Sequence, residues 1–388
     1  SWVLIASAAS GASPAAFDPI GELGHYDVTW DAPSRDWNGT MPIGNGEIGV
    51  NAWWEQGGDL RLLIARTDAW DESGRLVKVG LVRIGLRPNP VSSGRTFLQA
   101  LRLANGEIQF ILDGGRIEAR LWVDANRPLI EFEISGDDAI GAVATIERWR
   151  DQPRTIRYDG KSYFGDPAYS RPDQMEIVSL PDTFLPTDAV SGEASIGWYH
   201  NNGPTDWYER CARLQGLEGF RGKDPLENRV FGAIVTCAGA KREGDDTLVA
   251  PMARSHRFEI AVLTRQPSTP EEWMIEASSV TREAEGIPLE QRRKDHAQWW
   301  QEFWKRSWIF VSGNLDVARD SLVPTNAWPL RIGSDQAGRS RFPGEIGRVS
   351  FMWRNLADGD IAALVGSAHD APVPPGIRRS SAVCTCVW

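Results

Sequence analysis

Apolar and polar residues alternate with a period of two between residues 96 and 134, which is typical of half-buried β-strands. The pattern predicts strands over 96–103, 107–112 and 117–123 and a fourth that includes 130–134. The apolar positions that share one face are Ile117, Ala119, Leu121, Val123, Ile130, Phe132 and Ile134. The opposite face carries Glu118, Arg120, Trp122, Glu131 and Glu133. We therefore expect an antiparallel meander.

Turn residues separate these predicted strands. Asn105-Gly106 predicts a type I′ hairpin turn, and Asp113-Gly114-Gly115 predicts another tight turn. Similar apolar runs occur at 60–64, 81–86, 196–199, 231–236 and 258–263. So many strands between about 25 and 265 predict a mainly β fold, a large antiparallel sandwich of two sheets.

The pattern changes to helical after residue 268. Thr269-Pro270-Glu271-Glu272 fits a capping box with Pro at the first helical position. A second helix is predicted from Leu289 to Lys305, and its aromatic residues (Trp299, Trp300, Phe303 and Trp304) predict a docking face. Two short β-like runs around a loop follow within 313–370, and 371–388 shows no periodicity. The predicted order is a β-sandwich domain over 20–268, a helical linker over 269–312, a small β-rich jelly-roll-like fragment over 313–370 and a tail.

Composition narrows the function classes. The 388 residues hold 42 basic and 52 acidic side chains, a net charge of −10, without a basic block that would suit nucleic acid. No apolar run is long enough for a membrane-spanning helix. The 18 Trp against 6 Tyr favour deep packing, and flat Trp faces also suit sugar rings. We expect no cofactor and no metal.

The N-terminal segment, 1–19, has an apolar stretch followed by small residues, which resembles the remnant of a signal peptide. We therefore expect a secreted or periplasmic protein. A bridge between Cys211 and Cys237 is conceivable in an oxidising compartment, and two buried thiols are the alternative.

The densest motifs lie between residues 30 and 90. They include Trp30-Asp31-Ala32-Pro33-Ser34, Met41-Pro42-Ile43-Gly44-Asn45-Gly46-Glu47-Ile48-Gly49 and Arg66-Thr67-Asp68-Ala69-Trp70-Asp71-Glu72. Together with Trp198-Tyr199-His200-Asn201-Asn202 they resemble the N-terminal domain of a bacterial family of unknown function, number 5703. Proteins of that family resemble glycoside hydrolase family 95, whose β-super-sandwich has a segment related to Pro42-Ile43-Gly44-Asn45-Gly46. Residues 313–370 are similar to the closing part of a laminin-G/concanavalin-A-like domain.

The glycine-rich segment 43–49 indicates turns whose backbone conformations are not accessible to other residue types. The segment lacks the pattern of a phosphate-binding loop. Asp68, Asp71 and Glu72 lie near Trp70, as the paired carboxylates of a glycosidase would, but turn caps and ion pairs are the more common role of such residues. Their spacing fits no EF-hand. The candidate substrate-binding residues are Trp37, Asn45, Trp53, Trp54, Asp68, Trp70 and His200. No catalytic residue is assigned.

The resemblance implies a partner for the sandwich. In family 95 enzymes the catalytic carboxylates lie in an (α/α)₆ barrel after the sandwich and linker, and the residues after Ser312 are too few for such a barrel. The leading expectation is therefore a non-catalytic sandwich from an exported carbohydrate-processing protein. The alternatives are a glycosidase acting on fucosyl- or galactosyl-type glycans, and a lectin-like module that binds a glycan or polysaccharide.

Overall fold

The computed structural model describes residues 19–91, 95–158, 175–187, 194–214, 216–217, 219, 222–306, 309–311 and 384–386. The chain divides into two compact units, Gly24–Trp300 and a second unit formed by Ser1–Leu23 with Gln301–Trp388. The second unit contains α1 (Pro19–Leu23) and an antiparallel pair of strands, β17 (Ile309–Val311) and β18 (Cys384–Cys386). The predicted jelly-roll-like fragment, 313–370, lies outside the described residues, as does the predicted signal remnant up to residue 18.

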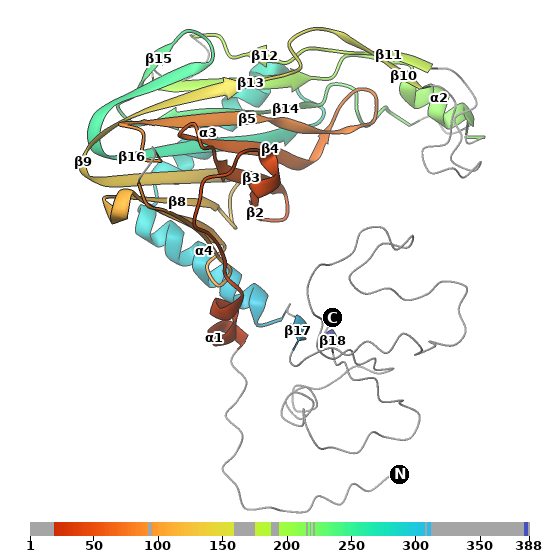
Figure 1. Ribbon diagram of the computed structural model, residues 1–388. Coiled ribbons are helices and arrows are strands. Elements are labelled where there is room, and N and C mark those ends of the chain that lie inside the picture. Colours follow the sequence, from red (N-terminus) through yellow and green to blue (C-terminus); the bar gives the residue numbers. More distant parts are fainter. Residues whose placement is uncertain are drawn as a thin grey trace, which may run out of the picture. The chain divides into compact units, whose positions relative to one another are not determined.

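The unit Gly24–Trp300 contains the predicted sandwich (Figure 1). Its strands are β1 (Val28–Trp30), β2 (Met41–Gly44), β3 (Ile48–Trp54), β4 (Asp59–Trp70), β5 (Leu76–Arg87), β6 (Phe97–Arg102), β7 (Glu107–Leu112), β8 (Ile117–Val123), β9 (Leu129–Glu147), β10 (Arg154–Tyr158), β11 (Met175–Ser179), β12 (Thr183–Phe184), β13 (Ser195–Asn201), β14 (Val230–Cys237), β15 (Lys241–Glu243) and β16 (Thr247–Arg265). Its α-helices are α2 (Trp207–Leu214), α3 (Pro270–Glu285) and α4 (Leu289–Trp304), the last of which continues into the second unit. Short 3₁₀ turns lie at Gly24–Tyr26, Trp37–Gly39 and Asp113–Gly115.

Among the described residues, 14 strands form one continuous antiparallel sheet that folds into two layers. The first layer has the order β1-β6-β7-β8-β9-β16-β14-β13-β12, and the second has β2-β3-β4-β5-β9-β16-β15. The long strands β9 and β16 belong to both layers because each bends midway. Their register shifts between Ala250 and Ser255 of β16, opposite residues 135–140 of β9. A mainly β sandwich is therefore confirmed.

The core fills the space between the layers. The face predicted to be apolar in the meander, 117–134, points inward, and Trp54 of the second layer meets Phe110 of the first with ring centroids 5.4 Å apart. The meander is confirmed strand by strand. The turn at Asn105-Gly106 is not type I′, because only Gly106 has a positive φ (61°) and that turn type needs two such residues.

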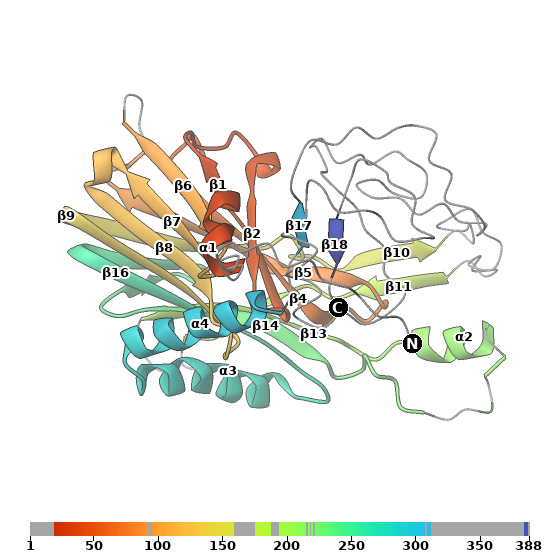
Figure 2. The ribbon, with the colours of Figure 1, turned by 90° about the horizontal axis from the view of Figure 1, so that it is seen from below.

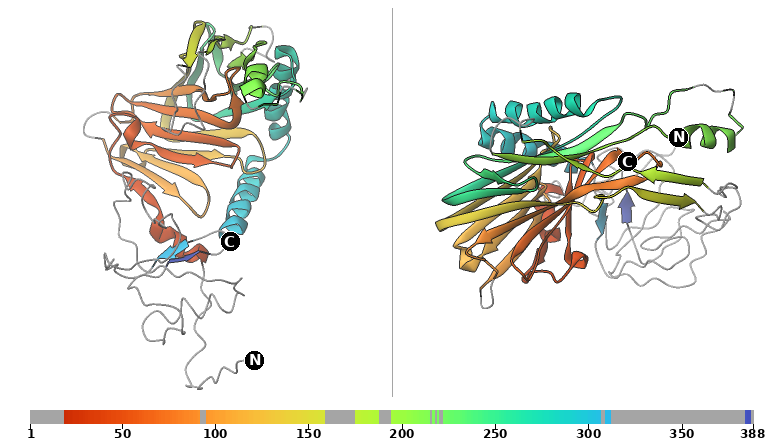
Figure 3. Two further views of the ribbon diagram at one scale, coloured as in Figure 1. Left: turned by 90° about the vertical axis from the view of Figure 1, so that its right-hand side faces the viewer. Right: turned by 90° about the horizontal axis from the view of Figure 1, so that it is seen from above.

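Helices α3 and α4 lie on the outer side of the first layer (Figures 2 and 3). The capping box at Thr269 is confirmed, with Thr269 accepting from the Glu272 N–H and Glu272 accepting from the Thr269 N–H. Trp273 of α3 is fully buried and donates to the Leu263 carbonyl. This packing buries a second apolar cluster on the outer face of β14 and β16.

Helix α4 packs on the sheet mainly through polar side chains, and of its aromatic residues Trp300 lies against Gly106. Its buried residues are Arg292 and His296, and His296 lies on Trp122 with ring centroids 4.8 Å apart. Trp299, predicted to dock, is 37% exposed. The prediction is wrong for Trp299 because polar partners on the sheet, Glu131 above all, contact the side of the helix that carries Arg292.

Cys237 is a free, buried thiol, so no Cys211–Cys237 bridge forms, and burial raises the pKa of Cys237 to about 11. Within the described residues, no helix has the length and apolar character needed to cross a membrane.

Candidate functional site

The tip of the β4–β5 hairpin is a turn closed by Asp71. Its Oδ1 accepts hydrogen bonds from the Ser73 N–H (3.0 Å), the Ser73 hydroxyl (2.7 Å) and the Arg75 N–H (3.0 Å), and Oδ2 accepts from Arg75 Nε (2.9 Å). Gly74 supplies the left-handed residue of the turn with φ 71°. The Asp71 carboxylate is therefore completely used within the turn, and it is fully buried.

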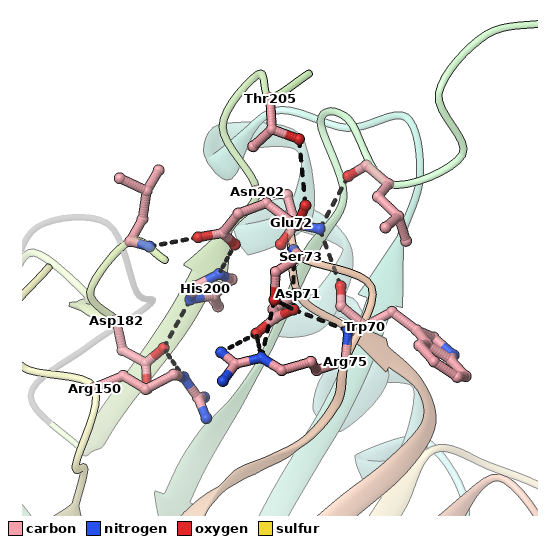
Figure 4. Close-up of polar contacts among 12 residues, drawn as sticks. Trp70, Asp71, Glu72, Ser73, Arg75, Arg150, Asp182, His200, Asn202 and Thr205 are labelled. Atoms are coloured by element: carbon pink, nitrogen blue, oxygen red, sulfur yellow. Dashed lines mark hydrogen bonds and ion pairs between the residues drawn. The ribbon is translucent and has the colours of Figure 1, made fainter. Parts of the chain in front are cut away.

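The next residue of the turn, Glu72, points inward and meets a histidine between two carboxylates (Figure 4). His200 Nε2 lies 2.8 Å from Glu72 Oε2, and His200 Nδ1 lies 3.1 Å from Asp182 Oδ1. The same Asp182 oxygen accepts from Arg150 Nε at 2.8 Å. The second oxygen of Glu72 accepts from the Leu180 N–H at 2.5 Å. We call Glu72, Asp182, His200 and Arg150 the histidine cluster.

The histidine cluster is buried and its charges balance. Burial alone would lower the pKa of His200, but the hydrogen bonds to Asp182 and Glu72 outweigh that effect and raise it. The protonated imidazole and Arg150 then carry two positive charges against two carboxylates. Both ring nitrogens face carboxylate oxygens, so the ring has no nitrogen left for a substrate. This arrangement is that of a structural ion cluster rather than of a general acid or base.

Asn202 and Thr205, which follow His200 in the chain, hold the backbone around Trp70. Asn202 Nδ2 donates to the Trp70 carbonyl at 3.0 Å, and the Thr205 hydroxyl donates to the Glu72 carbonyl at 3.3 Å. Trp70 Nε1 donates to the Thr67 carbonyl at 3.2 Å. The indole is 39% exposed, so the buried cluster supports an aromatic side chain that meets solvent.

Charged residues precede Trp70 on β4. Asp68 lies two residues before Trp70. The Asp68 carboxylate accepts from Arg66 Nε at 2.8 Å, and Arg66 also reaches Glu47 at 3.1 Å. Arg229 donates to the Asp68 carbonyl at 2.7 Å. Desolvation lowers the pKa of Arg229, and the nearby Asp68 opposes that change.

Residues 29–309 match the N-terminal domain of one family, which is described as "Domain of unknown function (DUF5703)". The chain belongs to this family. The resemblance seen in the motifs of residues 30 to 90 is thereby confirmed. No curated protein matches the chain.

Two solved structures are similar to this DUF5703 domain at low identity. One is titled "Putative kojibiose phosphorylase from human microbiome", with 12% identity, a TM-score of 0.34, and coverage of 70% of this chain and 33% of that one. The other is "Glycoside hydrolase family 81 from Clostridium thermocellum (CtLam81A), Mutant E515A", with 11% identity, a TM-score of 0.24, and coverage of 73% and 28%. The chain thus aligns with a third or less of each of these proteins.

The DUF5703 domain brings three of the predicted site residues together. Asp68 and Trp70 lie at the exposed hairpin, and His200 lies beneath it in the histidine cluster. Trp37 is exposed in a separate 3₁₀ turn, Trp37–Gly39.

Trp53, Trp54 and Asn45 have structural surroundings. Trp53 is 5% exposed and Trp54 is fully buried, with its Nε1 donating to the Gly58 carbonyl at 2.9 Å. Neither indole therefore presents a face to a ligand. Asn45 bridges the β2–β3 turn to the loop after β8: its Nδ2 donates to the Asp124 carbonyl (2.8 Å) and its Oδ1 accepts from the Ile48 N–H (2.8 Å). Its amide is fully used in holding that turn.

Sequence reasoning missed Asp182 and Arg150, the other half of the histidine cluster. Neither stands in a motif, and Arg150 also donates to the Val79 carbonyl at 3.0 Å, far along the chain. The signal available was the pair of polar residues His200 and Asn202 at the end of an apolar strand, which need buried partners. Among the residues that the structure describes, no group of three or more His, Cys, Asp or Glu side chains could hold a metal ion.

Proposed function

We propose that this DUF5703 domain is a non-catalytic β-sandwich domain of an exported carbohydrate-processing protein. The observation that carries the proposal is the state of the carboxylates beside Trp70. Asp71 and Glu72 are buried and fully bonded within the protein, and His200 is saturated by two carboxylates. The motif formed by residues 66–72 then marks a structural hairpin rather than an acid–base pair.

Glycoside hydrolysis needs two carboxyl groups about 5 to 10 Å apart that face the same bound sugar. Of the three carboxylates in the motif, Asp68 alone is open to solvent, and its side chain is paired with Arg66. A glycosidase that used Asp68 and Asp71 would have to break the turn at Arg75 to expose Asp71. The export part of the proposal is supported by the signal-like composition of the N-terminal segment.

A lectin-like role is the second candidate, and the exposed Trp70 favours it. An aromatic face flanked by a carboxylate and guanidinium groups offers stacking together with hydrogen-bond acceptors and donors, which suits a neutral sugar. The buried histidine cluster holds this hairpin in one conformation. A ligand that stacks on Trp70 therefore meets a surface that needs little ordering.

The first experiment measures hydrolysis. The purified chain is incubated with fucosylated, galactosylated and rhamnosylated oligosaccharides, and released sugar is quantified. We expect no release above the rate seen for heat-denatured protein. Turnover that disappears in both Asp68→Asn and Asp71→Asn would overturn the non-catalytic assignment and locate an active site at the β4–β5 hairpin.

The second experiment tests the lectin-like role through Trp fluorescence during titration with the same oligosaccharides. Saturable quenching that is lost in Trp70→Ala supports binding at the hairpin. Trp30→Ala is the matched control, because Trp30 is equally exposed, at 39%, and lies on β1. Absence of quenching by every sugar leaves the sandwich as a scaffold and refutes the lectin-like role.

A further inference from the structure

A groove of about 770 Å³ crosses the outer face of the first layer, beside the first turn of α4. Its floor consists of two rows of residues that pair across β7, β8, β9 and β16. The row next to α4 is Gln109, Arg120, Glu133 and Arg257, and the row beyond it is Ile111, Glu118, Ser135 and Ser255. Leu289 and Arg293 of α4 form one wall. Adjacent strands stand about 4.8 Å apart, so each row is about 14 Å long.

Two arginines of the groove, Arg120 and Arg257, are more exposed than glutamates that pair with them. Arg120 is 35% exposed and its partner Glu107 is 10% exposed. Arg257 is 32% exposed and its partner Glu259 is 6% exposed. Because the acidic partners are more deeply buried, the guanidinium groups of Arg120 and Arg257 are the more solvent-exposed charges of these pairs.

The third arginine of the groove, Arg293, has one partly buried and one exposed glutamate partner. It is 27% exposed, and its partner Glu133 is 13% exposed. Glu290 also pairs with Arg293, but it is 81% exposed and therefore screened by water. Burial lowers the pKa of Arg293, repulsion by Arg120 lowers it further, and Glu107 and Glu131 oppose this change in part. Two guanidinium groups that repel each other in this way would be stabilised by an anion placed between them.

The second row offers contacts of another kind. Ser135 and Ser255 present hydroxyl groups on neighbouring strands, and Ile111 is 37% exposed at the end of the row. Glu118 is the exposed carboxylate of this row. A ligand in the groove would thus meet guanidinium donors on the side toward α4, and hydroxyl groups with a small apolar surface on the other side.

We propose that this groove binds a linear glycan whose sugar units carry carboxylates, with Arg120, Arg257 and Arg293 as the carboxylate-binding residues. The inference rests on the proposed carbohydrate-related function and names a ligand class and a site away from the Trp70 hairpin. Arg120 and Arg257 stand two strands apart, about 10 Å, so they would contact carboxylates on separate units of the chain. The net charge of −10 disfavours general attraction of polyanions, so binding depends on this local row of arginines.

The test uses isothermal titration calorimetry of the full chain with an α-1,4-linked hexamer of galacturonic acid and with its methyl ester, which is neutral. The arginine variant is Arg120→Gln with Arg257→Gln. The matched control is Arg83→Gln: Arg83 lies on β5 of the other layer, is 37% exposed, and pairs with Asp59 and Glu147. Ser135→Trp fills the groove without changing its charge, and thermal melts confirm that each variant folds.

We expect the acidic hexamer to bind and the arginine variant to lose at least about tenfold in affinity, because each lost charge-assisted hydrogen bond has about that effect. Ser135→Trp should lose a similar factor, and Arg83→Gln should stay within about twofold of the unchanged protein, as expected of a distant charge. The neutral ester should bind at least about tenfold more weakly than the acid.

The inference would be overturned if the acidic hexamer did not bind, or if its ester bound equally well. It would also be overturned if Arg83→Gln lost as much affinity as the arginine variant. Finally, competition by poly-L-glutamate as strong as that by the hexamer would overturn it and would indicate an acidic protein surface as the ligand. Trp70→Ala in the same titrations separates the two proposals. If neutral sugars still quench Trp70 while the acidic hexamer does not bind, the carbohydrate role stands and the groove assignment falls. If Trp70→Ala alone abolishes binding of the hexamer, the site is the hairpin and the groove assignment is also refuted.

Discussion

Replacing His200 by Gln tests whether the histidine cluster is held together by a charged imidazole. Gln can hydrogen-bond to one carboxylate, but it carries no charge. The variant would leave Glu72 and Asp182 buried with Arg150 as the single cation among the four residues of the cluster. The expected loss comes from this uncompensated negative charge rather than from lost packing.

The magnitude follows from the burial of the partners. Removing one member of a buried ion pair costs about 3 to 5 kcal/mol, because the remaining charge stays desolvated. His200, Glu72 and Asp182 are each at most 3% exposed, so we expect a loss in this range. His256→Gln is the matched control: His256 is 8% exposed and contacts the Ile140 carbonyl at 2.7 Å, without a carboxylate partner that the structure describes. Its loss should be about 1 kcal/mol.

The pH dependence gives the sharper test. The pKa of His200 is raised in the folded protein above its ordinary value of 6.5. The folded state therefore holds a proton that the unfolded state releases, so the stabilisation is complete below pH 6.5 and is lost as the pH rises through the folded pKa. Urea unfolding of the two proteins between pH 6 and pH 9 should show a difference that shrinks with increasing pH. A constant or growing difference, or a loss no larger than that of His256→Gln, would refute the charged-imidazole assignment.

Two further substitutions test other contacts in the sandwich. Burial, with Glu259 nearby, raises the pKa of Glu131 to about 8, so the protein loses stability as the pH rises from about 4.5 through 8. In thermal melts, the stability of Glu131→Gln relative to the unchanged protein should therefore be higher at pH 9 than at pH 6. A relative stability that is equal or lower at pH 9 would contradict this. Gly106→Ala should lower the free energy of unfolding by about 1 to 3 kcal/mol, because Gly106 has φ 61° and a Cβ would lie 2.1 Å from Trp300 Nε1. Gly114→Ala is its control, because Gly114 has φ 70° and the atom nearest to its added Cβ would lie 3.9 Å away. Equal losses of stability in urea unfolding would show that backbone strain, and not the clash with Trp300, causes the effect.

The sandwich was largely predictable because alternation with a period of two is a local signal. The inward face of 117–134 follows from that alternation and from the need to bury its apolar side chains. The surroundings of the opposite face were not predictable. Glu131 and Trp122 alternate as surface residues should, yet both are buried, because α4, which begins more than 150 residues later, covers them. A period-two pattern reports the pleat of a strand and not what packs on its outer face.

The candidate site shows the same limit. Asp68, Asp71 and Glu72 are neighbours in sequence and appear as one carboxylate group. A register shift in the pairing of β4 with β5 after Ala65, followed by the turn, sends the three side chains to three different surroundings. The partner of Glu72, His200, lies 128 residues away and is positioned by the register of β13 against β14. Such pairings depend on long-range register, which the sequence pattern of a single segment does not contain.

The way the hairpin is held bears on what it can do. A general acid or base must exchange a proton with a ligand, so it needs an exposed atom and a proton that can leave. Glu72, Asp71 and His200 have neither, because each is buried and bonded to other protein groups. Recognition has the opposite requirement, since a rigid surface loses little conformational freedom when a ligand binds. An exposed Trp70 on a hairpin fixed from beneath meets the requirement for recognition, which is why the polar residues of this motif support a binding or scaffolding role over a catalytic one.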